Sequence, residues 1–184
     1  MEDGEIVERL LKGIDAGDFV EGDRLLPERR LAETMEISRA RLRRALDYPE
    51  DTAGRRMQTE FVAVPPFWTV GQTIDYMRDD EDLPGSFSQI FVIDPTFKLV
   101  GSVNLDRILR TKRGTKIEEI MDEPRSPITA EMDQEEAAQI FEQYDLLSAA
   151  VVDDNNRLVG VLTIDDVVDV IHEEADEDIK RLGG

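Results

Sequence analysis

The sequence repeats one pattern twice: Ile90-Phe91-Val92-Ile93-Asp94-Pro95-Thr96-Phe97-Lys98-Leu99-Val100-Gly101 and Ala149-Ala150-Val151-Val152-Asp153-Asp154-Asn155-Asn156-Arg157-Leu158-Val159-Gly160. The copies align without a gap. In each copy an apolar run, a polar turn and a second apolar run ending in Val-Gly predict two paired strands. The copies begin about 60 residues apart, a period that indicates two examples of one supersecondary unit.

Helical patterns flank both copies. Apolar residues recur at helical spacing in residues 70–77 and 134–141, before the strands. After each glycine a short strand leads into a helix, around residues 105–109 and 164–168. Each unit therefore reads β-α-β-β-α, and extra residues around Pro84 and Gly85 predict a longer loop in the first unit. We expect an α/β fold in which the two units pack through their sheets.

The C-terminal helix pattern is strongly acidic. Between Ile164 and Asp178 eight side chains are carboxylates and none is Lys or Arg. Such an acidic stripe repels itself unless a positive group lies on it, and a hard divalent cation is one candidate. On a helix the acidic stripe holds Asp166, Asp169, Glu173 and Glu177. A second, apolar stripe is expected to dock on a core, and it holds Val168, Ile171, Ala175, Ile179 and Leu182.

Composition narrows the classes of function. A chain of 184 residues with a formal charge of −20 suits one or two small domains that bind cations or a basic partner, or simply a soluble acidic protein. This net negative charge argues against a surface that binds nucleic acid. With no cysteine and one histidine, the chain has no disulfide, no thiolate site and no multi-histidine site. No signal peptide and no membrane span are expected, so the predicted location is cytoplasmic.

The repeat resembles the CBS domain, and two copies resemble a CBS pair, also called a Bateman module. The segments before and after it, residues 48–57 and 169–179, resemble the cytosolic region of the MgtE-type magnesium transporter family. The resemblance implies a tandem CBS domain pair preceded by a small all-helical segment. The expected domains are residues 1–47, 48–120 and 121–184, the last with an acidic C-terminal helix.

The MgtE-type resemblance implies magnesium ligands. Mg²⁺ takes oxygen ligands and keeps several waters, so scattered carboxylates are sufficient. The alternative is that these acids form a solvated helix face and a helix N-terminus that favours negative charge. Carried over by motif, the candidate metal ligands are Asp133, Glu135, Asp145, Asp166, Asp169, Glu174, Glu177 and Asp178.

The CBS resemblance also implies an adenine nucleotide, ATP or AMP, in the cleft between the repeats. The family pattern Gly-x-x-Thr/Ser-x-x-Asp is intact in the second copy as Gly160, Thr163 and Asp166. The first copy departs from it, with Arg107 at the Asp position as a possible phosphate contact. Leu146 stands where the family could stack an aromatic side chain on adenine. The alternative is that Thr163 only caps the following helix.

The implied function is a regulatory Mg²⁺ sensor rather than an enzyme. In the MgtE-type family the CBS pair precedes a connecting helix and a membrane domain, so that domain is the expected partner and the cytosolic face of the inner membrane the expected place. This chain stops where the connecting helix would begin, and no pore is expected in it. CBS pairs associate further as homodimers, and the helices after each glycine are expected to make that contact.

The first part of the chain resembles something different. Residues 25–46 resemble the helix-turn-helix of GntR-type regulators, whose second helix would present Arg39, Arg41, Arg43 and Arg44 to DNA. The wing that should follow is missing, because the chain passes directly to Tyr48-Pro49. Nucleic-acid binding is therefore not expected. A DNA-binding regulator with a CBS sensing domain stays the rival prediction.

Overall fold

The computed structural model describes residues 48–125 and 127–183. The predicted helical segment of residues 1–47, with Arg39, Arg41, Arg43 and Arg44, lies outside the described residues. Its helix-turn-helix interpretation and its DNA contacts therefore stay predictions.

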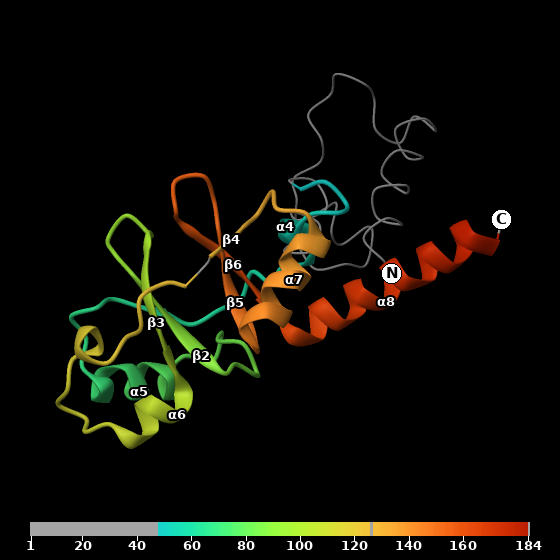
Figure 1. Ribbon diagram of the computed structural model, residues 1–184. Helices are drawn as coiled ribbons and strands as arrows, with labels where there is room; N and C mark the ends of the chain where they lie inside the picture. The colour runs from blue at the N-terminus through green and yellow to red at the C-terminus, as the bar shows by residue number, and fades with distance from the viewer. Residues whose placement is uncertain (1–47, 126, 184) are drawn as a thin grey trace, which may run out of the picture.

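Both units have the predicted β-α-β-β-α order (Figure 1). The first unit comprises β1 (Ala63–Val64), α5 (Val70–Asp79), β2 (Gln89–Ile93), β3 (Leu99–Asn104) and α6 (Leu105–Arg110), followed by the 3₁₀ turn η1 (Ile117–Glu119). The second comprises β4 (Ile128–Thr129), α7 (Gln134–Tyr144), β5 (Ser148–Val152), β6 (Leu158–Thr163) and α8 (Ile164–Gly183). The expected α/β fold of two repeats is confirmed.

Each unit contains a three-stranded sheet of the same topology. β1 runs parallel to β2 and β2 antiparallel to β3, and the order β4-β5-β6 repeats this arrangement. The sheets meet through one apolar cluster of both units, formed by Phe91, Leu99, Ala150, Val152, Leu158 and Val161. These residues face each other because alternate strand positions point to one side of a sheet. The sheet-to-sheet contact places both sets of sheet residues around shared clefts.

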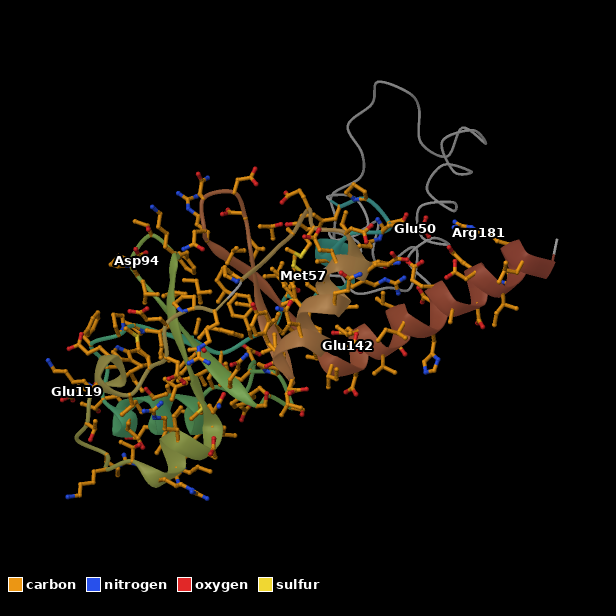
Figure 2. The ribbon with its side chains drawn as sticks, viewed as in Figure 1. Glu50, Met57, Asp94, Glu119, Glu142 and Arg181 are labelled. Carbon is orange, nitrogen blue, oxygen red and sulfur yellow. The ribbon has the colours of Figure 1, made fainter. Side chains whose placement is uncertain are left out.

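The two hairpin turns are built alike and tied together. Asp94 accepts hydrogen bonds from the backbone N–H groups of Thr96 and Lys98, at 2.8 and 3.0 Å. It also accepts one from the Thr96 hydroxyl at 2.7 Å, which lowers the pKa of Asp94 below its ordinary value of 3.8. The Leu158 N–H donates to Phe97 O at 2.9 Å, so the tip of one hairpin pairs with the other. Figure 2 shows Asp94 at the tip of the first hairpin.

The leading segment, residues 48–58, packs on the second unit although it precedes the first. It carries the short helix α4 (Ala53–Arg56), and the Gly54 N–H donates to Ala130 O at 2.8 Å. Met57 is buried in the core of the second unit (Figure 2). A Cβ on Gly160 would lie 2.5 Å from Met57 Sδ and 2.7 Å from Gln58 O. Gly160 therefore lets the leading segment cross β6 at close range.

The docking face of α8 differs from the prediction. Val167 and Val170 are the buried residues of α8, and the helix packs against α7. The predicted docking stripe is wrong, because Val168 is 41% exposed, Ile171 51%, Ile179 67% and Leu182 89%. Two causes account for this: α8 starts directly after β6, which sets its rotation, and it then extends beyond the core (Figure 1). The apolar stripe is therefore a surface feature.

Candidate functional site

An acidic junction lies where α7 meets α8. It consists of Asp133 and Glu135 at the start of α7 and of Glu174 and Asp178 on α8. A hydrogen bond with Glu174, and the negative charge of that residue, raise the pKa of Glu135 above its ordinary value of 4.5. The charges of Asp133 and Asp178 act in the same direction. The junction therefore has a negative potential that a proton or a cation relieves.

The same helices are joined by one arginine of the leading segment. Arg56 Nη1 donates to Glu173 Oε1 at 3.0 Å, and Nη2 forms an ion pair with Glu173 Oε2. Arg56 Nε donates to Gln134 Oε1 at 3.0 Å. The buried Gln134 side chain then donates to Glu174 Oε1 at 2.7 Å. Through this network α4, α7 and α8 share one set of hydrogen bonds beside the acidic junction.

The remaining predicted metal ligands are spread along α8 and at the end of α7. Asp145 is the C-cap of α7, in the left-handed conformation with φ 50°. Asp169 is exposed, and Glu177 pairs with Arg181 one helical turn away, at 4.0 Å. Within residues 48–125 and 127–183, no three acidic or histidine side chains are arranged to hold a metal ion. Among the residues that the structure describes, the predicted ligands therefore do not form a closed metal site.

Asp166 is engaged in a local cap. Its Oδ2 accepts hydrogen bonds from the Thr163 hydroxyl at 2.8 Å, from the Thr163 N–H at 3.2 Å and from Gln58 Nε2 at 3.4 Å. Asp166 is thereby held at the first turn of α8, where a carboxylate stabilises the helix N-terminus. A metal ion or a ribose would have to compete with these donors. The alternative that this pair caps α8 is consistent with the geometry.

Two clefts lie between the repeats. Cleft A has a volume of about 250 Å³ and is lined by Gln58, Glu60, Phe61, Val62, Pro84, Ser86, Phe87, Ser88, Gln89, Phe91, Leu147, Ser148, Val161, Thr163, Ile164 and Asp165. Cleft B has a volume of about 240 Å³ and is lined by Gln89, Phe91, Leu99, Gly101, Ser102, Asn104, Asp122, Glu123, Pro124, Arg125, Pro127, Leu146, Ser148, Ala149 and Ala150. The two clefts are separated by three residues that line both of them: Gln89, Phe91 and Ser148.

The predicted nucleotide residues are divided between these clefts. Thr163 lines cleft A, whereas Gly160 is the close-approach glycine next to Met57. Arg107 lies at the other cleft, because its Nη1 donates to Asp122 Oδ1 of cleft B at 3.2 Å. Leu146 also lines cleft B. The four predicted nucleotide residues therefore do not form one pocket.

Comparison with known families identifies the repeat. The CBS domain family matches residues 53–114 and 117–173, one stretch for each unit. This chain belongs to the CBS domain family, and its two units form a tandem CBS pair.

Among known proteins the chain is similar to MgtE. It is 33% identical over 150 residues to the magnesium transporter MgtE of Bacillus subtilis, covering 81% of this chain and 33% of that protein. It is 36% identical over 146 residues to MgtE of Thermus thermophilus, covering 79% and 32%. The chain thus spans about a third of the length of these relatives. The crystal structure of the cytosolic domain of the Mg²⁺ channel MgtE in complex with ATP superposes with a TM-score of 0.70 at 32% identity, covering 77% of this chain and 58% of that one.

Within the part of the chain that the structure describes, no helix is both long and apolar enough to cross a membrane.

The hydrogen-bond network beside the acidic junction was not predicted: Arg56 and Gln134 were not named as site residues, and Glu173 was named only as part of the acidic stripe. Arg56 and Glu173 are 117 positions apart, and no local pattern connects them. Gln134 follows the N-cap Asp133, so it reads as an ordinary first-turn residue. Only the packing of the leading segment on the second unit brings the three together.

Proposed function

We propose that this chain is a regulatory Mg²⁺-sensing CBS module of an MgtE-like magnesium transporter. The observation that carries the proposal is the acidic junction, where Glu135 and Glu174 meet beside Asp133 and Asp178. Carboxylates forced together in this way are stabilised by a bound cation, and hard oxygen ligands suit Mg²⁺. The similarity to MgtE supports this choice of cation.

A homodimer would complete the incomplete carboxylate sites. The helices that follow the two repeats expose equivalent apolar side chains, Leu109 on α6 at 70% and Val168 on α8 at 41%. Pairing of these faces in two copies would bring two acidic α8 helices into one assembly. Carboxylates of the two copies repel when Mg²⁺ is scarce, and Mg²⁺ stabilises the closed arrangement because it binds that arrangement more tightly.

In a whole transporter this closure would act on a membrane domain, and the module would lie in the cytoplasm. The role is regulatory rather than enzymatic. Ligands shared between copies and open to water imply weak, millimolar affinity.

The test is the response of the purified chain to millimolar Mg²⁺. We expect Mg²⁺ to reduce the radius of gyration in X-ray scattering and to raise the melting temperature. NaCl of equal ionic strength should do neither, because screening alone does not bridge carboxylates. The variant Glu135→Gln with Asp178→Asn, which removes two acids of the acidic junction, should weaken both responses.

A matched control removes the same charge elsewhere. Asp79→Asn with Glu81→Gln changes two exposed acids at the end of α5 and should leave the Mg²⁺ response unchanged. Superimposable scattering curves with and without Mg²⁺ would refute sensing by this chain. Equal loss of response in both double variants would show a general charge effect instead.

A second candidate function is adenine-nucleotide binding at cleft B. The similar MgtE cytosolic domain was crystallised with ATP, and cleft B is the cleft with cations, Arg125 in its lining and Arg107 on Asp122. Arginine matches phosphate geometry. Calorimetric titration with ATP and AMP tests this, and Arg125→Gln should weaken ATP binding at least about tenfold if phosphate is held there. No heat with either nucleotide would remove this candidate.

A further inference from the structure

We propose that the basic segment of residues 37–46 docks on an exposed apolar face of α8 in the same chain. This docking goes beyond the proposed Mg²⁺ response and does not depend on it. It rests on the surface that α8 exposes, on the charge of that surface, and on the place where the described chain begins.

The docking surface is the part of α8 that extends beyond the core. Four exposed side chains follow one another at intervals of one helical turn and form what we call the outer stripe: Ile171, Ala175, Ile179 and Leu182. Apolar residues aligned in this way are typical of a helix face that packs against a partner. Val168, the homodimer residue one turn earlier, is not part of the outer stripe, so the two surfaces are separate.

Acids border the outer stripe on both sides. Asp178 lies one helical turn from Ala175 and from Leu182, and Asp176 lies one turn from Ile179. The whole of α8 contains eight carboxylates against two cations, both of them in its last turn. A partner that fits this surface therefore has an apolar face with positive charge along its edges.

Residues 37–46 have this composition. Their sequence, Ile-Ser-Arg-Ala-Arg-Leu-Arg-Arg-Ala-Leu, contains four arginines and no acid. On the helix that the sequence predicts here, Leu42 and Leu46 share one face. Arg39 is one turn from Leu42, and Arg43 is one turn from Leu46. The apolar face of the segment and its arginines therefore match the outer stripe and its acids.

The described chain begins close to this surface. The carbonyl oxygen of Tyr48 accepts a hydrogen bond from Arg55 Nη1, and the next residue, Arg56, donates to Glu173 of α8. Leu182 lies only about 14 Å further along α8 than Glu173. Residues 37–46 end two positions before Tyr48, so they are tethered beside the outer stripe. A short tether gives an effective concentration of about millimolar, at which weak contacts are sufficient.

A second basic stretch, residues 107–116, fits the outer stripe less well. Its arginines are engaged on the first unit, where Arg107 pairs with Asp122 and Arg113 pairs with Asp75. Figure 1 shows α6, at the start of this stretch, far from the free end of α8. The stretch could therefore reach the outer stripe only from another copy of the chain.

Docking would supply the positive charge that α8 lacks. Arginines placed beside Asp176 and Asp178 relieve the repulsion among the acids, because opposite charges one turn apart stabilise a helix and like charges destabilise it. The leucines of the segment cover the outer stripe. The chain would thus provide the counter-charge for its own last helix.

The experiment is crosslinking of the full chain in metal-free buffer of low ionic strength. The chain has no cysteine, so Ala45→Cys with Ala175→Cys introduces two thiols and no others are present. A short bismaleimide should join them within one chain, at a rate independent of protein concentration. The control pair is Ala45→Cys with Asp79→Cys, at the exposed end of α5. The Ala175 pair should react at least about tenfold faster than this control.

Charge reversal tests the role of the arginines. Arg39→Glu with Arg43→Glu, added to the Ala45–Ala175 cysteine pair, should slow the crosslink at least about tenfold. The matched control is Arg110→Glu with Lys112→Glu, which makes the same charge change at exposed cations of the second basic stretch. This control should leave the crosslinking rate unchanged.

A neutral variant tests the apolar contact. Ile179→Ser with Leu182→Ser alters no charge and should also slow the crosslink at least about tenfold. Both side chains are exposed, so folding should be retained, and circular dichroism melts check it.

Three results would overturn the proposal. They are a crosslink no faster than in the control pair, a crosslink that joins two copies and increases with protein concentration, and equal rates in the two charge-reversal variants. Because Mg²⁺ is absent, none of these results bears on the proposed sensing role.

Discussion

Glu135 in the first turn of α7 lies beside Glu174 of α8, and the interaction between these two carboxyl groups raises the pKa of Glu135. The neighbouring Gln134 and Arg56 fix this arrangement by holding Glu174 and Glu173 in place. Acidic repulsion at the junction is therefore built into the packing of three helices. It is the feature on which a cation or a proton would act.

Glu135→Gln should raise the melting temperature at neutral pH. The pKa of Glu135 is raised in the folded chain, so between its ordinary value of 4.5 and the raised value the folded state binds more protons than the unfolded state. Stability therefore falls as the pH increases through that window, and the variant should flatten this fall. Melts over a pH series check it, with the exposed neighbour Glu136→Gln as control. A variant that melts below the wild type at neutral pH would contradict the repulsion.

Arg56→Gln should destabilise the chain by about 1–2 kcal/mol, the range for charge-assisted hydrogen bonds reduced for partial exposure. The side chain of Arg56 is 24% exposed and that of Glu173 42%. The control is Arg181→Gln, which removes only the exposed pair with Glu177 at 4.0 Å and should change little. Urea unfolding measures both. If the two variants lose the same free energy of unfolding, the Arg56 network stabilises the chain no more than an exposed ion pair does.

Gly160→Ala should destabilise the chain by about 1–3 kcal/mol, as small-to-large changes do in packed sites. The added Cβ would meet Met57 Sδ and the backbone oxygen of Gln58, and backbone cannot move aside cheaply. Gly114→Ala, with no atom within 4 Å of its added Cβ, should be nearly neutral. Denaturant midpoints compare the two, and similar midpoints would disprove the close crossing.

Asp94→Asn should lower the melting temperature by a few degrees at neutral pH. This is roughly the shift that a modest loss of unfolding free energy causes in a chain of this size. The pKa of Asp94 is lowered by its bonds to Thr96 and Lys98, so its contribution is present above the ordinary value of 3.8 and is lost as the pH falls. The variant should therefore differ least from the wild type in acid. Asp154→Asn, an exposed acid in the second turn, is the control for charge.

Leu109→Asp with Val168→Asp should convert a homodimer into a monomer. In the single chain Leu109 is 70% exposed and Val168 41%, so folding should be retained. Light scattering coupled to size exclusion measures the mass. Leu182→Asp, exposed at 89% near the far end of α8, should leave the assembly intact. Figure 2 shows the neighbouring Arg181 near that end of the helix. A wild-type monomer would contradict the assembly.

Much of the fold was predictable because the strands and turns of each repeat are determined by residues close together in the sequence. The strands around Val92 and Val151 and the polar turns at Asp94 and Asp153 follow from alternation and turn chemistry within a few residues. The longer loop after α5 was also predictable from Pro84 and Gly85. The rotation of α8 was not predictable, because Val167 and Val168 are equally apolar and the connection to β6 and the contact with α7 decide which of them is buried.

The candidate site was predictable only in part. Periodicity placed acids along α8, but the Glu135–Glu174 pair depends on how α7 and α8 cross. The role of Arg56 could not be predicted, because its partner Glu173 is more than a hundred positions away. The leading segment also packs on the second unit rather than the first. Cleft A and cleft B likewise depend on the register between sheets, which no single repeat encodes.

The guanidinium of Arg56 couples the beginning of the described chain to its last helix. A displacement of α8 therefore reaches the leading segment through Glu173, as well as β6 through the chain itself. One side chain thus links the position of the last helix to the segment that leads into the pair of repeats.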